Sequence, residues 1–175
     1  VFLCALPMTH IFALTACGLL GMRKGAKLLL VANPRDITGF IKLLMKHPDI
    51  NIFPGVNTLF HALIHRLEFK QVSLPNLLVT IGGGMAVQKP VADRWQELTG
   101  TPIVEGYGLS ETSPVLTSNP LIGENRVGTI GIPWPSTEIR ILKDDETWAE
   151  VGEAGEIVVE KSSSALIVPD VVTGH

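Results

Sequence analysis

The sequence predicts an α/β fold in which a parallel β-sheet is flanked by helices. Short apolar runs alternate with longer segments of helical periodicity, and the strand-like runs are apolar on both faces. Glycine and proline follow many of these runs. Strands that are buried on both sides and separated by helices are typical of a parallel sheet between helical layers.

The strand and helix patterns alternate along the first hundred residues. Strands are expected at 1–6, 26–31, 50–53, 77–81 and 101–107, and helices at 10–22, 36–47, 56–66 and 88–99. Asp36 is placed to cap the second helix and Gly100 to end the fourth. Right-handed crossovers would bring the carboxyl ends of all five strands to one edge of the sheet.

From about residue 120 onward the pattern changes. Glycines and prolines punctuate short runs such as "TEIRIL" and "GEIVVE", and no helical periodicity appears. This pattern predicts an antiparallel β unit that is at least partly complete. Residues 161–175 show no clear pattern.

Composition excludes some classes of function. The chain has 175 residues, of which 46% are hydrophobic, and this is enough for the core of one domain, with or without a piece of another. A net charge of −3, without a basic run longer than two residues, argues against a nucleic-acid partner. Cys4 and Cys17 lie in apolar surroundings outside any C-x-x-C pattern, which favours buried thiols over a disulfide or a metal role. Such free thiols fit a reducing, cytoplasmic setting.

The apolar opening, residues 1–22, is long enough to raise the question of a membrane span. Pro7, His10 and Gly18 interrupt it, and no charged flank precedes it, so we expect a buried strand followed by a buried helix. The start within a strand-like run suggests that an upstream portion is missing.

Unusual residues follow four of the predicted strands, at 7–10, 54–56, 82–84 and 106–111. Open parallel sheets bind ligands at this edge. Glycines allow close backbone approach, Tyr107 offers a stacking face, Ser110 a hydroxyl, and Glu111 a hard oxygen ligand for Mg²⁺. An adenine nucleotide with its metal would use each of these groups.

Each group also has a plain structural explanation. The glycine triplet is a turn, Tyr107 a core residue, Glu111 part of a first helical turn, and His10 a buried, hydrogen-bonded histidine. The convergence of several strand ends is what favours a site. The chain has no G-x-x-x-x-G-K-[ST], G-x-G-x-x-G or G-x-S-x-G motif, so a P-loop NTPase, a Rossmann dehydrogenase and an α/β-hydrolase are not supported.

Longer phrases resemble the adenylate-forming enzymes, which include acyl-CoA synthetases, luciferases and peptide-synthetase adenylation domains. "EGYGLSETSP" resembles their core signature, "LPMTHIFALT" an upstream motif, and "TIGGGMAVQKPVADRWQELTG" the glycine-rich adenine segment. "NPRDITGFIKLLMKHP" and "GVNTLFHALI" are similar to bacterial long-chain-fatty-acid–CoA ligases, and "RVGTIGIPWPSTEIRIL" to the family's β-barrel subdomain.

This resemblance implies an organisation into three parts. A flavodoxin-like sheet subdomain that carries the acyl- and adenine-binding loops is expected at 1–120, and part of a small antiparallel β-barrel at 121–160. Residues 161–175 form an unmatched tail. The family's phosphate loop, ribose-binding aspartate, hinge and carboxy-terminal domain with its catalytic lysine are absent from the chain. The resemblance therefore identifies a central fragment of the ligase's large domain.

The resemblance also implies roles for individual residues. Nucleotide-binding roles fall on Gly82, Gly83, Gly84, Glu105, Gly106, Tyr107, Gly108 and Ser110. Tyr107 would stack on adenine, Glu105 and Gly106 would lie at its edge through their backbone, and Ser110, where most members carry threonine, would lie beside the α-phosphate. Glu111 would hold Mg²⁺. His10 would lie near the acyl carboxylate, and Gly55 and Val56 would line the acyl tunnel, so the catalytic group would be His10, Ser110 and Glu111.

The implied reaction joins a fatty acid to CoA through an acyl-adenylate formed with Mg·ATP, and the fragment by itself is expected to be inactive. The alternatives are a fragment of a fatty acyl-AMP ligase or a medium-chain acyl-CoA synthetase, or a non-catalytic nucleotide- or acyl-binding module. A fatty-acid substrate fits a cytoplasmic enzyme that contacts the inner face of the cell membrane peripherally. A divided core would favour self-association through apolar patches.

Overall fold

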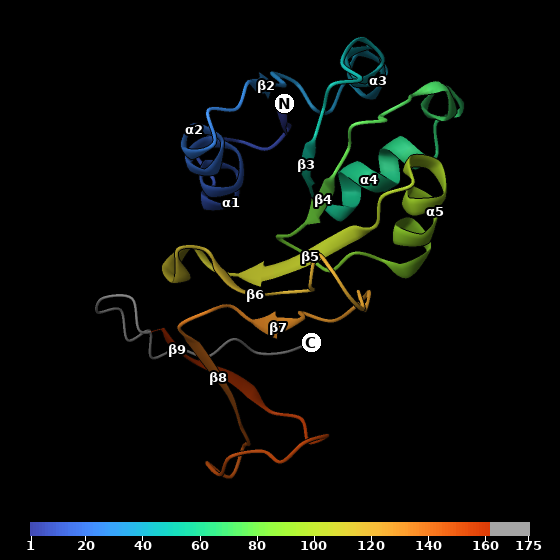
Figure 1. Cartoon of the computed structure of the whole chain (residues 1–175). Helices are drawn as coiled ribbons and strands as arrows, with labels where there is room; N and C mark the ends of the chain where they lie inside the picture. The colour runs from blue at the N-terminus through green and yellow to red at the C-terminus, as the bar shows by residue number, and fades with distance from the viewer. Residues whose placement is uncertain (162–175) are drawn as a thin grey trace.

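The computed structural model describes residues 1–161, and a seven-stranded sheet lies at its centre (Figure 1). The strands, in the order β2-β1-β3-β4-β5-β6-β7, are Leu28–Leu30, Phe2–Cys4, Ile52–Gly55, Val79–Gly82, Ile103–Gly108, Val115–Ser118 and Ile132–Pro133. The first five in this order pair in parallel. They correspond to the five strands expected from the sequence, and the α/β fold class is confirmed.

Helices cover both faces of the sheet. They are α1 (Ile11–Ala13), the π-helix η1 (Leu14–Leu19), α2 (Leu20–Arg23), α3 (Ile37–Lys46), α4 (Asn57–Ile64), the 3-10 helix η2 (Leu67–Gln71) and α5 (Lys89–Thr99). The segment from α1 to α2 lies on one side of the sheet, and α3, α4 and α5 lie on the other (Figure 1). Asp36 caps α3 by accepting a 3.0 Å hydrogen bond from the amide of Gly39, and Gly100 ends α5 in a left-handed conformation, both as expected.

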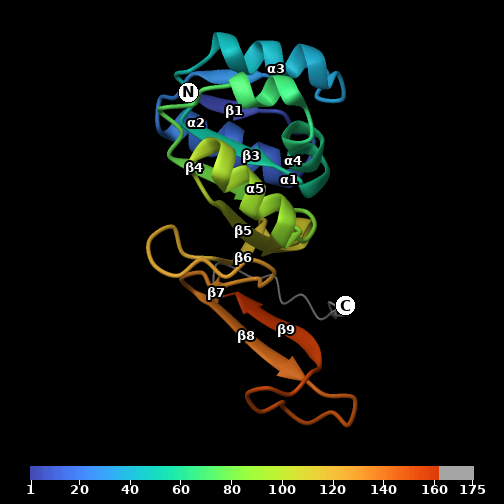
Figure 2. The same ribbon diagram turned by 90° about the vertical axis from the view of Figure 1, so that its right-hand side faces the viewer.

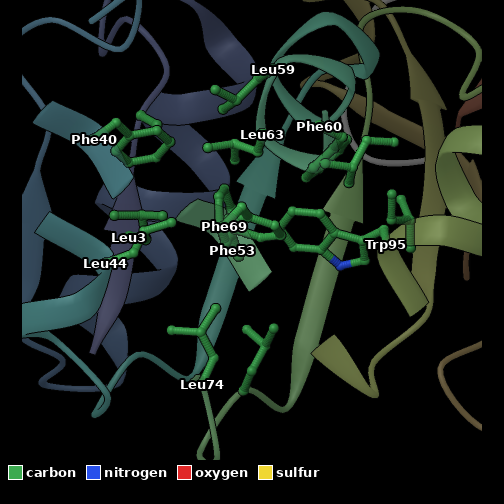
Figure 3. Close-up of a cluster of buried hydrophobic side chains, with 14 of the residues drawn as sticks. Leu3, Phe40, Leu44, Phe53, Leu59, Phe60, Leu63, Phe69, Leu74 and Trp95 are labelled. Atoms are coloured by element: carbon green, nitrogen blue, oxygen red, sulfur yellow. The ribbon is translucent and has the colours of Figure 1, made fainter. Parts of the chain in front are cut away.

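The main core lies between the sheet and the helices α3 to α5. Figure 3 shows the buried aromatic side chains gathered around Trp95. The indole contacts Phe53 and Phe60 edge-on, at centroid distances of 5.1 and 4.8 Å, and stacks on Phe69 at 5.5 Å. Its N–H donates a 3.1 Å hydrogen bond to the hydroxyl of Thr80 on β4, so the one polar atom of this ring is satisfied inside the core.

The expectation of a buried first helix is wrong in part. Ala13 and Cys17 are buried against β1, but Leu14, Leu19 and Met22 are exposed on the outer face. The helical segment is only partly buried because its small residues face the sheet, whereas its large apolar residues lie on the exposed side. No helix of the described residues is long and apolar enough to cross a membrane.

Two strands of the main sheet were not expected. After β5 the chain turns through the 3-10 helix η3 (Ser110–Thr112) into β6, which pairs antiparallel with β5, and β7 pairs antiparallel with β6. The predicted antiparallel unit follows as β8 (Thr137–Leu142) and β9 (Glu156–Lys161), which pair over their whole length. This hairpin projects away from the sheet (Figure 2). Residues 162–175, most of the expected tail, lie outside the described residues.

Candidate functional site

A cavity of about 290 Å³ opens at the carboxyl ends of the strands. Four segments line it, residues 10–12, 81–84, 106–111 and 114–115. Three of the four strand ends singled out in the sequence therefore meet around one space. The lining residues among the predicted ones are His10, Gly82, Gly83, Gly84, Gly106, Tyr107, Gly108, Ser110 and Glu111.

The signature segment forms a tight hairpin between β5 and β6. The hydroxyl of Thr112 accepts a 2.9 Å hydrogen bond from the amide of Leu109 and lies 2.8 Å from the carbonyl oxygen of Pro114, to which it can donate. A Cβ atom on Gly108 would lie 1.6 Å from that same oxygen. Gly108 is thus required by the turn itself, which brings Ser110 and Glu111 to the mouth of the cavity.

The glycine triplet lies beside the end of β3 and the start of the first helix. The amide of Gly83 donates a 3.3 Å hydrogen bond to the carbonyl of Gly55, and a Cβ on Gly83 would lie 3.0 Å from the ring of Phe12. Gly84 has a φ of +75°, and the nearest atom to its absent Cβ belongs to Val56. Gly55 and Val56 therefore border the triplet, but they do not line the cavity itself.

Gly106 differs from these glycines because the protein does not require it sterically. A Cβ there would meet only the carbonyl oxygen of Thr117, at an ordinary 3.8 Å. Since Gly106 lines the cavity, the missing side chain leaves space where a ligand could approach the backbone.

Tyr107 is half-buried and belongs to the residues that line the cavity. Its hydroxyl oxygen is buried without a hydrogen-bond partner among the described residues. Burial raises the pKa of this hydroxyl above its usual value, so the group is neutral at physiological pH. The side chain is thus an uncharged aromatic group beside the cavity.

His10 is exposed and caps the first helix. Its Nδ1 accepts a 3.2 Å hydrogen bond from the amide of Phe12, so Nε2 is the ring nitrogen that is left to donate. The expectation of a buried histidine does not apply. The Nε2–H is a donor that could bind a carboxylate oxygen at the cavity.

Glu105 lies behind the cavity and does not line it. Its side chain is buried, and its two carboxylate oxygens accept hydrogen bonds from the amides of Val87 and Gly128, at 2.9 and 2.7 Å. Its backbone carbonyl accepts a further hydrogen bond from Asn119 at 2.9 Å. The residue therefore supports the site from inside the protein.

Sequence reasoning missed three contributors to this geometry. Phe12 lines the cavity and packs on the triplet, Thr112 closes the hairpin, and the Glu105 side chain bridges two loops. Only Glu105 gave a usable signal, because a carboxylate inside the apolar run "PIVEGY" needs hydrogen-bond donors when it is buried.

Comparison with known proteins identifies the family of the chain. The model of the family described as "AMP-binding enzyme" matches residues 1–166. The chain belongs to the AMP-binding enzyme family. The resemblance to adenylate-forming enzymes seen in the sequence is thereby confirmed.

Curated relatives of this AMP-binding chain carry the name long-chain-fatty-acid–CoA ligase. The protein from Haemophilus influenzae is 49% identical over 156 residues, and that from Bacillus subtilis is 35% identical over 156 residues. These alignments cover 89% and 88% of the chain but only 28% and 27% of the relatives. The chain thus spans little more than a quarter of the length of the relatives that it matches.

Solved structures support the fold of the AMP-binding chain. The anthranilate CoA ligase AuaEII in complex with anthranoyl-AMP matches with a TM-score of 0.85 over 92% of this chain and 31% of that chain, at 21% identity. The N-terminal domain of FACL13 from Mycobacterium tuberculosis matches with a TM-score of 0.78 over 91% of this chain and 39% of its own, at 24% identity. At this level of identity the likeness concerns the fold.

Proposed function

We propose that the chain is the central part of a long-chain-fatty-acid–CoA ligase and carries one half of its adenylation site. The observation that supports this proposal is the single cavity that gathers Gly82 to Gly84, Tyr107, Ser110, Glu111 and His10. The names and identities of the curated relatives favour the long-chain class over a medium-chain synthetase or an acyl-AMP ligase. The parent enzyme would use ATP, CoA and a fatty acid.

The adenine ring would lie between the glycine triplet and Tyr107. The neutral phenol ring supplies a stacking surface, and the lack of a side chain at Gly106 leaves the backbone there open to the base. Gly108 would contribute to the site indirectly, by allowing the tight turn between β5 and β6. Glu105 would take part at the adenine edge through its backbone, because its side chain points to Val87 and Gly128.

The α-phosphate would lie next to Ser110, and Glu111 would hold Mg²⁺. No group of three or more acidic, histidine or cysteine side chains suited to a metal occurs within residues 1–161. One carboxylate completed by phosphate oxygens is nevertheless a donor set that Mg²⁺ commonly uses, so the residue fits the ion. When bound, the ion would neutralise charge that develops on the phosphate oxygens.

The fatty-acid carboxylate would approach from the side of His10. As the helix cap fixes the imidazole with Nε2 protonated, His10 would donate a hydrogen bond to that carboxylate and orient it. Gly55 and Val56, which border the triplet, would form the start of the acyl tunnel. Attack of the carboxylate at the α-phosphorus, with cleavage of the bond to the leaving pyrophosphate, needs no protein nucleophile, only positioning and charge stabilisation.

The same proposal assigns the parts of the chain. Residues 1–120 would carry the acyl- and adenine-binding loops, 121–160 would belong to the β-barrel subdomain, and 161–175 would lie outside the match. Location in the cytoplasm, peripheral contact with the inner face of the membrane, and self-association of the fragment belong to the proposal as well.

Saturation-transfer NMR with Mg·ATP tests the proposed site, because it detects ligands that bind at roughly millimolar Kd. We expect transfer to the adenine protons, and its loss in Tyr107→Ala. Trp148→Ala is the matched control, since Trp148 is an exposed aromatic residue that stacks with Arg140 in the β8–β9 hairpin and lies outside the cavity. Transfer that persists in Tyr107→Ala would show that the ring does not bind the base.

A turnover assay with palmitate, Mg·ATP and CoA tests the fragment interpretation. We expect no acyl-CoA from the 175-residue chain, because it matches only 28% of the length of the Haemophilus influenzae ligase. Turnover that is lost in Glu111→Gln would contradict this interpretation and identify a complete enzyme.

A further inference from the structure

The Glu105 carboxylate connects two loops that are distant in sequence. One is the segment 84–88, which joins the glycine triplet to α5, and the other is the segment 123–129, which lies within the connection from β6 to β7. The amides of Val87 and Gly128 donate to different oxygens of this one carboxylate, Oε2 and Oε1. A single buried side chain therefore holds both loops against β5.

A carboxylate is the side chain that this position requires. Glu105 is 7% exposed, and no ion pair between the described residues includes it. Its negative charge is stabilised by the two amide donors, and such charge-assisted hydrogen bonds are stronger than neutral ones. Glutamine has the same shape but only one acceptor oxygen, so its NH₂ group would face one of the two amides.

Each loop has other attachments that do not reach the opposite loop. The amide of Gln88 donates to the side chain of Asn57, at 3.0 Å. The side chain of Asn125 donates to the carbonyl of Ile103, at 2.9 Å, and that of Asn119 accepts from the amide of Arg126 and donates to the carbonyl of Thr129. Of the hydrogen bonds within residues 1–161, those of the Glu105 side chain are the ones that join the two loops.

We propose that Glu105 is a positioning residue that couples the glycine-rich wall of the cavity to the 123–129 segment leading toward the β8–β9 hairpin. A nucleotide against Gly82 to Gly84 would then tighten the 123–129 segment, and a displacement of that segment would loosen the glycine-rich wall. The effect on nucleotide binding rests on the proposed function, whereas the link between the loops does not.

The test combines amide exchange by ¹⁵N NMR with titration of Mg·ATP, in the 175-residue chain and in Glu105→Gln. Glu105→Gln should speed exchange by about tenfold or more at the amide that its NH₂ group faces, and Glu105→Ala should do so at both Val87 and Gly128, since neither amide then has an acceptor. The Kd for Mg·ATP should rise by roughly tenfold, because the carboxylate no longer holds the glycine-rich wall of the cavity in place. Circular dichroism checks that both Glu105 variants are folded, and Glu105→Ala also removes the misplaced NH₂ group.

Asn125→Ala is the matched control, since Asn125 fixes the 123–129 segment to β5 without contacting the glycine-rich loop. It should speed exchange at Gly128 more than at Val87 and raise the Kd by less than the Glu105 variants do, because the carboxylate still joins the two loops. Faster exchange at only one of the two amides in Glu105→Ala would overturn the link. If the unmodified chain binds Mg·ATP and the Glu105 variants bind it equally well, the positioning role is wrong while the proposed function stands. An unmodified chain that binds no nucleotide would end the proposed function and the positioning role together, and the exchange data would still decide the link.

Discussion

Gly108 packs directly against the carbonyl group of Pro114, across the turn that joins β5 to β6. The distance of 1.6 Å from an added Cβ to the carbonyl oxygen leaves no room for alanine. The Gly108→Ala variant should therefore lose about 2–3 kcal/mol of unfolding free energy in a urea titration. Gly106→Ala, where the nearest atom is 3.8 Å away, should change it by less than about 1 kcal/mol. Equal stability of the two variants would show that the turn is not closed as described.

The stability of the chain should depend on Tyr107 in alkaline solution. Burial raises the pKa of its hydroxyl in the folded state, so the resulting stability is present below the unfolded pKa of about 10 and is lost as the pH rises through the folded pKa. Unfolding free energies between about pH 8 and pH 11 should fall more steeply for the unmodified chain than for Tyr107→Phe. Near neutral pH the phenylalanine variant should be at least as stable, because the hydroxyl has no partner among the described residues. Parallel pH curves would contradict the burial of this hydroxyl.

The two cysteines should be unreactive in the folded chain. Cys4 and Cys17 are both free and buried, and burial together with the neighbouring Cys4 raises the pKa of the Cys17 thiol strongly. Since the thiolate is the reactive form, alkylation by iodoacetamide should be more than about 100-fold slower than in urea-unfolded chain. Mass spectrometry would follow the two alkylations. Rapid labelling of the folded chain would mean that the space beneath the first helix opens to solvent.

Thr80 should stabilise the core through its hydroxyl. It accepts the indole N–H of Trp95, and both side chains are fully buried. Thr80→Val leaves that N–H without an acceptor and should cost about 1–3 kcal/mol, measured by urea titration. Thr80→Ser keeps the acceptor and loses one methyl group, so it should cost only about 1 kcal/mol. A valine variant that is more stable than the serine variant would argue against this hydrogen bond.

The sequence was sufficient to predict the parallel sheet, because alternation of strand and helix patterns is set locally. The ends of α3 and α5 were also predictable, since Asp36 and Gly100 have specific backbone roles. The strands β6 and β7 were missed. They are short, and their pairing depends on the turn made by Gly108 and Thr112, which no periodicity indicates.

For the candidate site as well, some features could be predicted from the sequence and others could not. Glycines and a lone tyrosine after successive strands predicted that distant loops meet, because parallel strands end at one edge. The direction of the Glu105 side chain and the packing of Phe12 on Gly83 depend on tertiary contacts. Such contacts join residues that are far apart in sequence, and a single sequence does not contain their distances.

The π-helix from Leu14 to Leu19 has a consequence for the spacing of the residues around it. Ala13, Cys17 and Gly21 all face the sheet at intervals of four, and in an α-helix each such interval overshoots one turn by about 40°. The wider π turn absorbs this drift, so Gly21 still meets Leu28 at its narrow contact. If the same residues formed a regular α-helix, the two intervals would add to about 80°, and Gly21 would be turned away from the edge strand β2. The π turn thus adjusts the rotation of the helix, so that small residues face the sheet all the way from the cap at His10 to the edge strand β2.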